Sequence, residues 1–309
     1  MTAESDSDVA VESASADGRR ATSVAELGEM MARFISVESY TAGLAFTPRP
    51  TDVVIAPYAK CGTTWLQQMA HSLRTGGDLD FDDISRVVPW IETAGDLGLD
   101  LDAPQRGEPR LYKSHLAWDD VPKGACYVVA ARDPRDAVVS VYRFFEGWFF
   151  EPGSIAIEEL GRVRFLESRG YYTHLASWLR HRDAPGVLLM AYEQMMSDAE
   201  GTVRRVAELM GIDPSDELVA IACDESSFAS MREHADRYDD RMMRGLSERA
   251  CGLPAGSDSS KVRTGTVGGH RTELSDAFLA ELDAVWQETI GAEFGLANYE
   301  ALLSDLAGS

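Results

Sequence analysis

Short apolar runs alternate with helical patterns along most of this chain. Three runs have the length, the apolar content and the flanking turn residues of buried parallel strands: 53–55, 125–131 and 187–191. A fourth run, 111–115, has the pattern of a short strand end. Helical patterns lie between these runs. The alternation predicts one α/β domain in which a central, mostly parallel β-sheet is flanked by helices on both faces.

Helices are predicted where apolar residues recur at three- and four-residue spacing. The segment from Ser23 to Tyr40 has this pattern, and Ser23 can act as its N-cap. Asp133 and Pro134 supply an N-cap and a first-turn proline for a later helix. Further helices are predicted directly after the loop 58–64, over 203–210 with Gly211 as the terminator, and from a Ser275 cap to Ile290.

Two segments lack a regular pattern. Residues 1–22 are rich in Ser, Ala, Asp and Glu, which predicts a disordered acidic tail ahead of a domain over 23–305. Residues 226–267 form an irregular stretch that is too long for a plain connection. We expect this stretch to be a lid or a substrate loop.

The formal net charge is −22, from 29 basic and 51 acidic residues among 309. Such a surface disfavours nucleic acid, anionic membranes and sulfated polysaccharides as partners, so any anion site must be a local cluster of Lys and Arg. Cys61, Cys126, Cys223 and Cys251 have neither metal-ligand nor disulfide spacing, which favours a reducing cytoplasm. No apolar run is long enough for a membrane span. The oligomeric state stays open.

The stretch from Tyr58 to Trp65 joins the first predicted strand to a helix. A lysine ammonium, two threonine hydroxyls and the positive end of the helix dipole converge there, which suits a phosphate or a sulfate. A tight strand-to-helix turn without a ligand is the alternative. The stretch is not a Walker A loop, because Lys60 precedes Gly62, and an ordinary ATPase is therefore disfavoured.

This stretch resembles the 5′-phosphosulfate loop of the cytosolic sulfotransferases, usually Y-P-K-S-G-T-T-W, with Ala59 and Cys61 as departures. In that family the loop binds the cofactor 3′-phosphoadenosine 5′-phosphosulfate (PAPS). The resemblance implies a P-loop-like nucleotide-binding fold and a cofactor site at Lys60, Cys61, Gly62, Thr63, Thr64 and Trp65. Cys61 replaces a serine, and we expect its thiol to be exposed beside Lys60 and to ionise readily.

Arg132 and Ser140 lie eight residues apart, at a strand end and about two turns into the next helix. Ligands of open parallel sheets bind outside the carboxyl ends of the strands, so Arg132 is expected to meet a ligand of the first loop. A surface arginine and a helix serine are the alternative. The segment 132–140 resembles the family's R-N-P-K-D-x-x-x-S, which implies that the guanidinium and the hydroxyl bind the 3′-phosphate of PAPS.

The sequence Lys113, Ser114, His115, Leu116 resembles the family's K-[ST]-H-L, whose histidine is the catalytic base. The resemblance implies that His115 removes the proton of the acceptor hydroxyl, a role that suits the near-neutral pKa of an ordinary imidazole. Lys60 and Lys113 would stabilise the charge on the leaving phosphate and the transferring sulfuryl group. A structural histidine after a strand is the alternative.

Later matches concern the nucleotide. Arg263, Thr264 and Gly265 resemble the start of R-K-G-x-x-G-D-W, which closes over the 3′-phosphate, although Thr264 replaces a lysine and a flexible glycine-rich linkage is the alternative. The adenine is expected near Tyr192, Ser226 and Phe228, with Trp65 on its other face.

We therefore expect a PAPS-dependent sulfotransferase that acts on a hydroxyl of a small, largely apolar acceptor such as a phenol, sterol, lipid or polyketide alcohol. Its pocket is expected among aromatic residues: Trp90, Phe144, Phe145, Trp148, Phe149 and Phe150. A small-molecule kinase lacks support because the chain has no Walker lysine, and a purely nucleotide-binding protein would not need His115 or Lys113. Dehydration of an alcohol through transient sulfation stays open.

Overall fold

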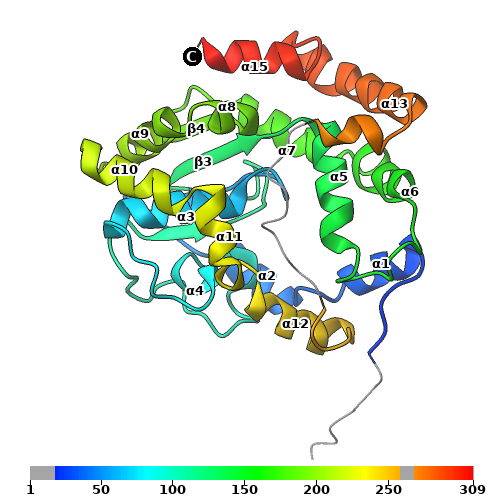
Figure 1. Ribbon diagram of the computed structural model, residues 1–309, viewed down its shortest axis with the longest axis horizontal. Helices are drawn as coiled ribbons and strands as arrows, with labels where there is room; N and C mark the ends of the chain where they lie inside the picture. Colours follow the sequence, from blue (N-terminus) through cyan, green and yellow to red (C-terminus); the bar gives the residue numbers. More distant parts are fainter. Residues whose placement is uncertain (1–17, 258–267, 309) are drawn as a thin grey trace, which may run out of the picture.

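Four parallel strands form the central sheet in the computed structural model, which describes residues 18–257 and 268–308. The strand order is β2-β1-β3-β4, and Figure 1 labels the neighbouring strands β3 and β4. The strands are β1 (Val53–Ile55), β2 (Leu111–Lys113), β3 (Cys126–Ala131) and β4 (Val187–Ala191). Ile55 pairs with Lys113 on one side and with Val128 on the other. The predicted parallel α/β sheet and its strand positions are confirmed.

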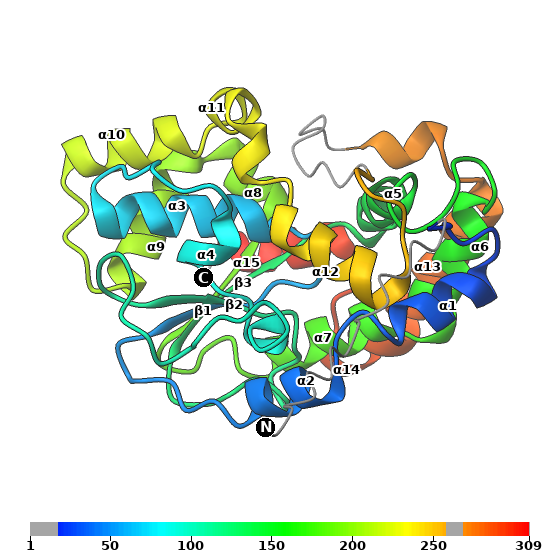
Figure 2. The same ribbon diagram turned by 90° about the horizontal axis from the view of Figure 1, so that it is seen from below.

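Successive residues of each strand face opposite sides of the sheet, and each side has its own apolar core. Val53, Ile55, Val128 and Met190 belong to one core, whereas Val54, Val129 and Leu189 belong to the other. The first core is covered by α3 (Thr63–Thr75), α9 (Ala199–Leu209) and α10 (Asp216–Glu225), and the second by α5 (Pro134–Phe145), α7 (Gly170–Leu179), α13 (Asp276–Trp286) and α15 (Tyr299–Ala307). Figure 2 shows α3, α9 and α10 on one side of the strands and α7 on the other.

The predicted caps begin the helices that carry or support the site. At the start of α5, the carboxylate of Asp133 accepts the backbone N–H of Arg135 at 2.9 Å, and Pro134 is the first helical residue. At the start of α13, the hydroxyl of Ser275 accepts the N–H of Phe278 at 3.2 Å. These caps accept N–H groups that the helix itself leaves unpaired. For this reason the start of each of the two helices could be predicted from the sequence.

The single helix predicted over 23–40 is wrong. Two helices cover this region: α1 (Val24–Met31), which begins at the predicted cap, and α2 (Val37–Leu44). Ser36 separates them, because it caps α2 and donates a hydrogen bond from its hydroxyl to Asp96 at 2.6 Å. The break therefore depends on a contact with a residue far along the chain, which the spacing of apolar residues does not reveal.

The predicted tail over 1–22 is wrong at its carboxyl end. Residues 1–17 lie outside the described residues, but the rest of this segment packs on the domain. Ala21 is fully buried, and its N–H donates to the carbonyl of Phe149 at 2.9 Å. Backbone pairing and burial order this part of the chain although its composition is that of a tail.

The stretch 226–267 is not irregular in its described part. It contains α11 (Phe228–Glu233) and α12 (Arg241–Cys251), and α12 buries Met243. Only α11 is short, with six residues; α12 has 11 residues, as many as α9 and α13, so its pattern was missed although it is present in the sequence. Residues 258–267 lie outside the described residues.

The remaining helical segments are short. They are α4 (Ile84–Val87), α6 (Ile157–Gly161), α8 (Tyr192–Ser197), α14 (Ala292–Phe294), the 3₁₀ segments Ile91–Thr93, Ala235–Arg237 and Gly269–Thr272, and the π-helical segments Arg162–Glu167 and Gln287–Gly291. In the part of the chain that the structure describes, no helix is long and apolar enough to cross a membrane.

Candidate active site

Each strand of the sheet delivers a predicted site residue at its carboxyl end. The loop 58–62 follows β1, Lys113 ends β2, Arg132 follows β3 and Tyr192 follows β4. Because the strands are parallel, these ends meet at one edge, where they border a cavity of about 800 Å³. The predicted residues that line this cavity are Lys60, Gly62, Thr63, Thr64, Trp65, Lys113, His115, Arg132, Ser140, Tyr192, Ser226 and Phe228.

The loop after β1 leaves the first turn of α3 open toward the cavity. Lys60 and Gly62 both have a positive φ, at 68° and 93°, and a side chain on Gly62 would meet the Tyr192 ring at 3.0 Å. No side chain caps α3, and the buried Thr63 hydroxyl has no hydrogen-bond partner among the described residues. Unpaired N–H groups, a free hydroxyl and a lysine fit the phosphosulfate end of PAPS.

Arg132 lies beside the first loop, as predicted. Its guanidinium donates to the carbonyl of Lys60 at 3.0 Å and stacks on the ring of Tyr192, with 4.6 Å between the guanidinium carbon and the ring centroid. The Tyr192 ring in turn lies edge-on to Trp65, 5.9 Å between centroids. The ends of β3 and β4 and the start of α3 are thus joined by direct contacts. Ser140 lines the same cavity from α5.

His115 has a defined tautomer. Its Nδ1 lies 2.7 Å from the carbonyl oxygen of Pro57. A carbonyl can only accept, so Nδ1 carries the proton and Nε2 of the neutral ring keeps its lone pair. Trp90 lies edge-on to the imidazole, with 5.2 Å between the ring centroids. In the neutral ring, Nε2 is therefore the nitrogen that can accept a proton.

The two lysines of the site rest on aromatic rings. The Nζ atom of Lys60 lies 4.0 Å from the centroid of Phe144, and that of Lys113 lies 3.9 Å from the centroid of Trp90. An aromatic face attracts a cation, and so it can hold an ammonium group in surroundings that are otherwise apolar. Lys113 itself is buried, with 4% of its surface exposed. The charges of both lysines are therefore positioned before any ligand binds.

The other side of the cavity is apolar. Of the predicted aromatic residues, Trp90, Phe144, Phe145, Trp148 and Phe149 line it, together with Met31, Phe34, Ile35, Met231 and Met243 from α1, the residues after it, α11 and α12. Phe150 does not line the cavity, which corrects the prediction for this residue. It is fully buried and packs on Tyr142, with 5.4 Å between the ring centroids.

Comparison with known proteins decides the family. The model of the sulfotransferase domain matches residues 50–294, which is most of the chain. The chain belongs to the sulfotransferase family. Rat sulfotransferase 2A6 is 29% identical over 260 residues, which cover 79% of this chain and 86% of the rat protein. Rat sulfotransferase 1C2 is 23% identical over 287 residues, which cover 88% of this chain and 94% of that protein. The predicted PAPS-dependent sulfotransferase is confirmed at this level.

Solved sulfotransferase structures share the fold. Mouse sulfotransferase SULT7A1, complexed with PAP, superposes with a TM-score of 0.64 at 19% identity and covers 89% of this chain and 95% of its own. Retinol dehydratase, in a complex with retinol and PAP, superposes with a TM-score of 0.62 at 20% identity, covering 84% of this chain and 85% of its own.

Glu92 was not predicted, and it supports the histidine of this sulfotransferase. Its carboxylate is buried and accepts the backbone N–H of His115 at 2.9 Å. Burial raises the pKa of Glu92 above its ordinary value. The signal in the sequence is a single carboxylate directly after the apolar run 87–91, where a buried charged residue needs a partner.

Asp136 is a second residue that was not predicted, and it anchors the chain at Gly268 and His270 to α5. It accepts the backbone N–H of Gly268 at 2.6 Å and the Nδ1 group of His270 at 2.8 Å. Burial alone would raise the pKa of Asp136, but these hydrogen bonds lower it below its ordinary value. Residues 263–265 of the predicted 3′-phosphate signature lie outside the described residues, just ahead of this contact.

The expectation for Cys61 is wrong. Its thiol is fully buried beneath the loop and does not line the cavity. The sulfur contacts the carbonyl of Ala59 at 3.9 Å, and burial raises the pKa of Cys61 to about 12. The positive φ angles of Lys60 and Gly62 turn the loop so that this side chain faces the core. The family's serine position is therefore a packing position in this protein.

Proposed function

We propose that this sulfotransferase moves the sulfuryl group of PAPS to a hydroxyl of a small, largely apolar acceptor, with His115 as the general base. The observation that carries the proposal is the hydrogen bond between His115 Nδ1 and the Pro57 carbonyl at 2.7 Å. It leaves the Nε2 lone pair on a residue that lines the cavity. An imidazole in this tautomer accepts a proton without first losing one.

When bound, PAPS supplies an electrophilic sulfuryl group attached to a phosphate leaving group. Lys60 and Lys113 stabilise negative charge at that position. The first-turn N–H groups of α3 and the hydroxyls of Thr63 and Thr64 hold the 5′ end. Arg132 and Ser140 bind the 3′-phosphate together with Arg263, Thr264 and Gly265, while Trp65, Tyr192, Ser226 and Phe228 hold the adenine.

The apolar wall of the cavity supports an apolar acceptor. Aromatic rings and methionine side chains adapt to flat or fused-ring molecules, which fits phenol, sterol, lipid and polyketide alcohols. Retinol and androsterone, which are bound in two neighbouring structures, are small alcohols of this kind. The segment 226–257 supplies Met231 and Met243 to this wall, in keeping with a substrate-loop role for this region.

We also propose a cytoplasmic location. Cys61, Cys126, Cys223 and Cys251 are all free thiols, as expected in a reducing compartment. The oligomeric state stays open.

The test is incubation of the purified protein with PAPS and a panel of phenols, sterols and aliphatic alcohols, followed by mass spectrometry. A sulfated product is expected, whereas a dehydrated product would mark transient sulfation. His115→Ala should lower turnover by ~10² to 10⁴. His181→Ala is the control, since His181 stacks on Trp118 outside the cavity. Near-normal turnover by His115→Ala would show that His115 is not the general base. Phosphoryl transfer from ATP, without PAPS, would instead favour the small-molecule kinase.

A further inference from the structure

Arg164 is a charged side chain in the acceptor half of the cavity. It belongs to the π-helical segment Arg162–Glu167 and lines the cavity together with the aromatic wall. Its guanidinium carbon lies 5.6 Å from the ring centroid of Phe145, within the range of a cation–π contact. The ring holds the cation against the wall but does not neutralise its charge.

Arginines around Arg164 are paired with carboxylates. Arg162 is paired with Glu281, Arg169 with Glu288, and Arg143 with both Glu146 and Glu273. Over residues 18–257 and 268–308, the guanidinium of Arg164 has neither a carboxylate partner nor a hydrogen bond. This chain has 51 acidic and only 29 basic residues, so carboxylates are abundant. Arg164 therefore presents an uncompensated positive charge to the cavity, where an anionic group of a bound molecule can pair with it.

The aromatic wall connects Arg164 to the transfer centre. Phe145 packs against Phe144, with 5.7 Å between the ring centroids. Phe144 in turn carries the Nζ atom of Lys60 at 4.0 Å. One adjacent pair of rings thus separates the guanidinium from a lysine of the phosphosulfate loop.

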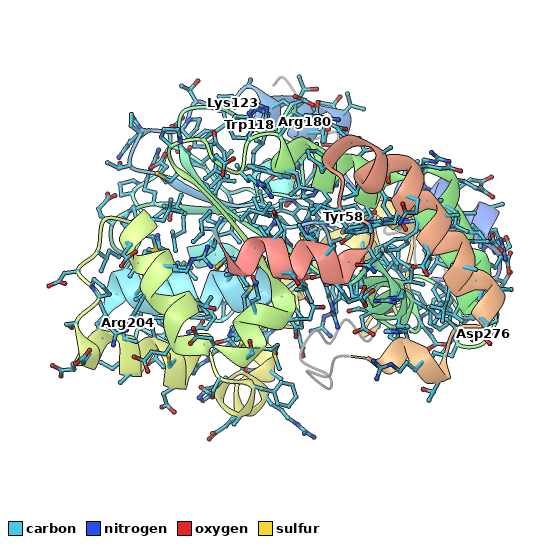
Figure 3. All side chains as sticks on the ribbon, turned by 90° about the horizontal axis from the view of Figure 1, so that it is seen from above. Tyr58, Trp118, Lys123, Arg180, Arg204 and Asp276 are labelled. Atoms are coloured by element: carbon cyan, nitrogen blue, oxygen red, sulfur yellow. The ribbon has the colours of Figure 1, made fainter. Side chains whose placement is uncertain are left out.

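Tyr58 provides a second connection between Arg164 and the transfer centre. Tyr58 and Arg164 both line the cavity, and the Tyr58 ring lies edge-on to Phe165, the residue after Arg164, with 6.1 Å between the ring centroids. Tyr58 directly follows Pro57, whose carbonyl fixes His115. In Figure 3, Tyr58 is labelled near the centre of the view. His115 and the π-helical segment that carries Arg164 therefore contact neighbouring residues of the same loop.

Arg164 lies apart from the predicted 3′-phosphate residues along α5. Its ring partner Phe145 is the last residue of this helix, whereas Ser140 lies five residues earlier. Five helical residues correspond to a rise of about 7.5 Å. The guanidinium is therefore placed at the aromatic end of α5, where the acceptor pocket is, and not beside Ser140.

We propose that Arg164 binds a carboxylate of the acceptor, so that the preferred substrates are apolar hydroxy acids and not neutral alcohols. The inference rests on the proposed function, because it assigns one end of the same acceptor pocket. A planar guanidinium binds a carboxylate through two parallel hydrogen bonds. Apolar surroundings strengthen such a bond, and the wall of Phe144, Phe145 and Trp148 supplies them.

The test compares each acid with its own methyl ester, which keeps the hydroxyl and the apolar body but removes the charge. The probes are para-hydroxybenzoic acid, a hydroxynaphthoic acid and a hydroxybiphenyl carboxylic acid, so that different spacings are sampled. For the acid that fits best, kcat/KM should exceed that of its ester by about 10- to 100-fold.

Arg164→Met should bring this acid-to-ester ratio down to about one, while Arg164→Lys keeps part of the preference. Arg162→Met is the matched control: Arg162 lies two residues away and also stacks on a phenylalanine, but it is paired with Glu281 outside the cavity. It should keep the wild-type ratio. A ratio compares two substrates on one enzyme, so an overall loss of activity does not imitate the effect.

Two results would overturn the inference and leave the proposed function intact: every ester is sulfated at least as well as its acid, or Arg164→Met keeps the wild-type ratio. Sulfation of none of the probes, neutral phenols included, would instead remove the proposed function and this inference with it.

Discussion

The two halves of the cavity are built in different ways. The transfer half comes from the carboxyl ends of parallel strands, and each strand contributes residues that are neighbours in the sequence. The acceptor half comes from α1, from α5 and from the neighbouring helices α11 and α12. These three regions are separated by long stretches of chain, and each helix contributes one or a few side chains. Strand register thus positions the chemistry, whereas helix packing shapes the pocket that selects the acceptor.

The halves also differ in how they treat charge. In the transfer half, Lys60, Lys113 and Arg132 are held over aromatic rings and beside backbone carbonyls. In the acceptor half, carboxylates pair with Arg143, and Arg164 rests on one ring. Changes in the first half should therefore lower rate or cofactor affinity, and changes in the second should alter the choice of acceptor.

The largest effect is expected from Lys60→Met in the transfer half. Methionine keeps the contact with Phe144 but removes the charge that stabilises the transition state, so kcat should fall by ~10² to 10³. Lys123→Met is the control, because Lys123 lies over Trp118 at 5.0 Å outside the cavity, and Figure 3 shows both near one edge of the molecule. Initial rates with saturating PAPS measure this. If both variants lose activity equally, Lys60 has no special role.

Arg132→Ala should weaken binding of the product nucleotide PAP by about 10- to 100-fold, because it removes a charge-assisted hydrogen bond to phosphate. Arg135→Ala is the matched control. Arg135 lies three residues further on, is paired with Asp133 and Glu300 at 2.6 Å, and does not line the cavity. Titration calorimetry measures both affinities. An equal loss in the two variants would show that only the net charge matters and would remove the 3′-phosphate assignment.

His174 packs beneath the first loop of the transfer half: its ring lies edge-on to Tyr58, with 5.7 Å between the centroids. Its titration therefore tests how this packing affects the stability of the protein. Burial lowers the pKa of His174 from 6.5 to about 4, in agreement with Nε2 accepting the indole N–H of Trp178 at 3.2 Å. Between these pH values the unfolded state binds more protons, so stability is present near neutral pH and is lost as the pH falls.

At pH 5 this single group should cost about 2 kcal/mol of unfolding free energy relative to pH 7. His174→Gln keeps an acceptor for Trp178 without the titration, so its stability should fall less on acidification. Urea denaturation at the two pH values measures the difference. If the unfolding free energies of the wild type and of His174→Gln fall equally between pH 7 and pH 5, His174 is not a source of the acid sensitivity.

The smallest effect is expected from Phe144→Leu in the acceptor wall. Loss of the aromatic face should raise the KM for aryl acceptors by about 2- to 10-fold, more than it raises the KM for PAPS. Steady-state kinetics with both substrates varied measure the two constants. If only the KM for PAPS changes, Phe144 acts only through its contact with Lys60. Phe144 would then belong to the transfer half and not to the acceptor half.

The transfer half could be predicted from the sequence because its residues occur in short local patterns. A strand, a tight loop and a helix follow each other within about a dozen residues around Lys60, and Asp133 caps α5 next to Arg132. Such patterns are set by local hydrogen bonding and by φ preferences. The contacts of Glu92 with His115 and of Asp136 with Gly268 have no local pattern, since their partners are distant in the sequence.

The orientation of Cys61 could not be predicted from the sequence, although the residue lies inside a recognised motif. Its neighbours identify the loop, but whether its thiol faces solvent or the core depends on the turn at Lys60 and Gly62 and on what packs beneath. The same holds for Phe150: the two residues before it, Trp148 and Phe149, line the cavity, whereas its own side chain does not.

The sequence by itself determined the parallel α/β architecture, the family and the residues at the strand ends, because period, caps and motifs are local properties of the chain. The tertiary structure alone decided that Cys61 is buried, that α1 and α2 are separate, and that Arg164 lines the acceptor cavity without a carboxylate partner among the described residues. The physical reason is that burial, charge pairing and cavity shape depend on which distant elements pack together.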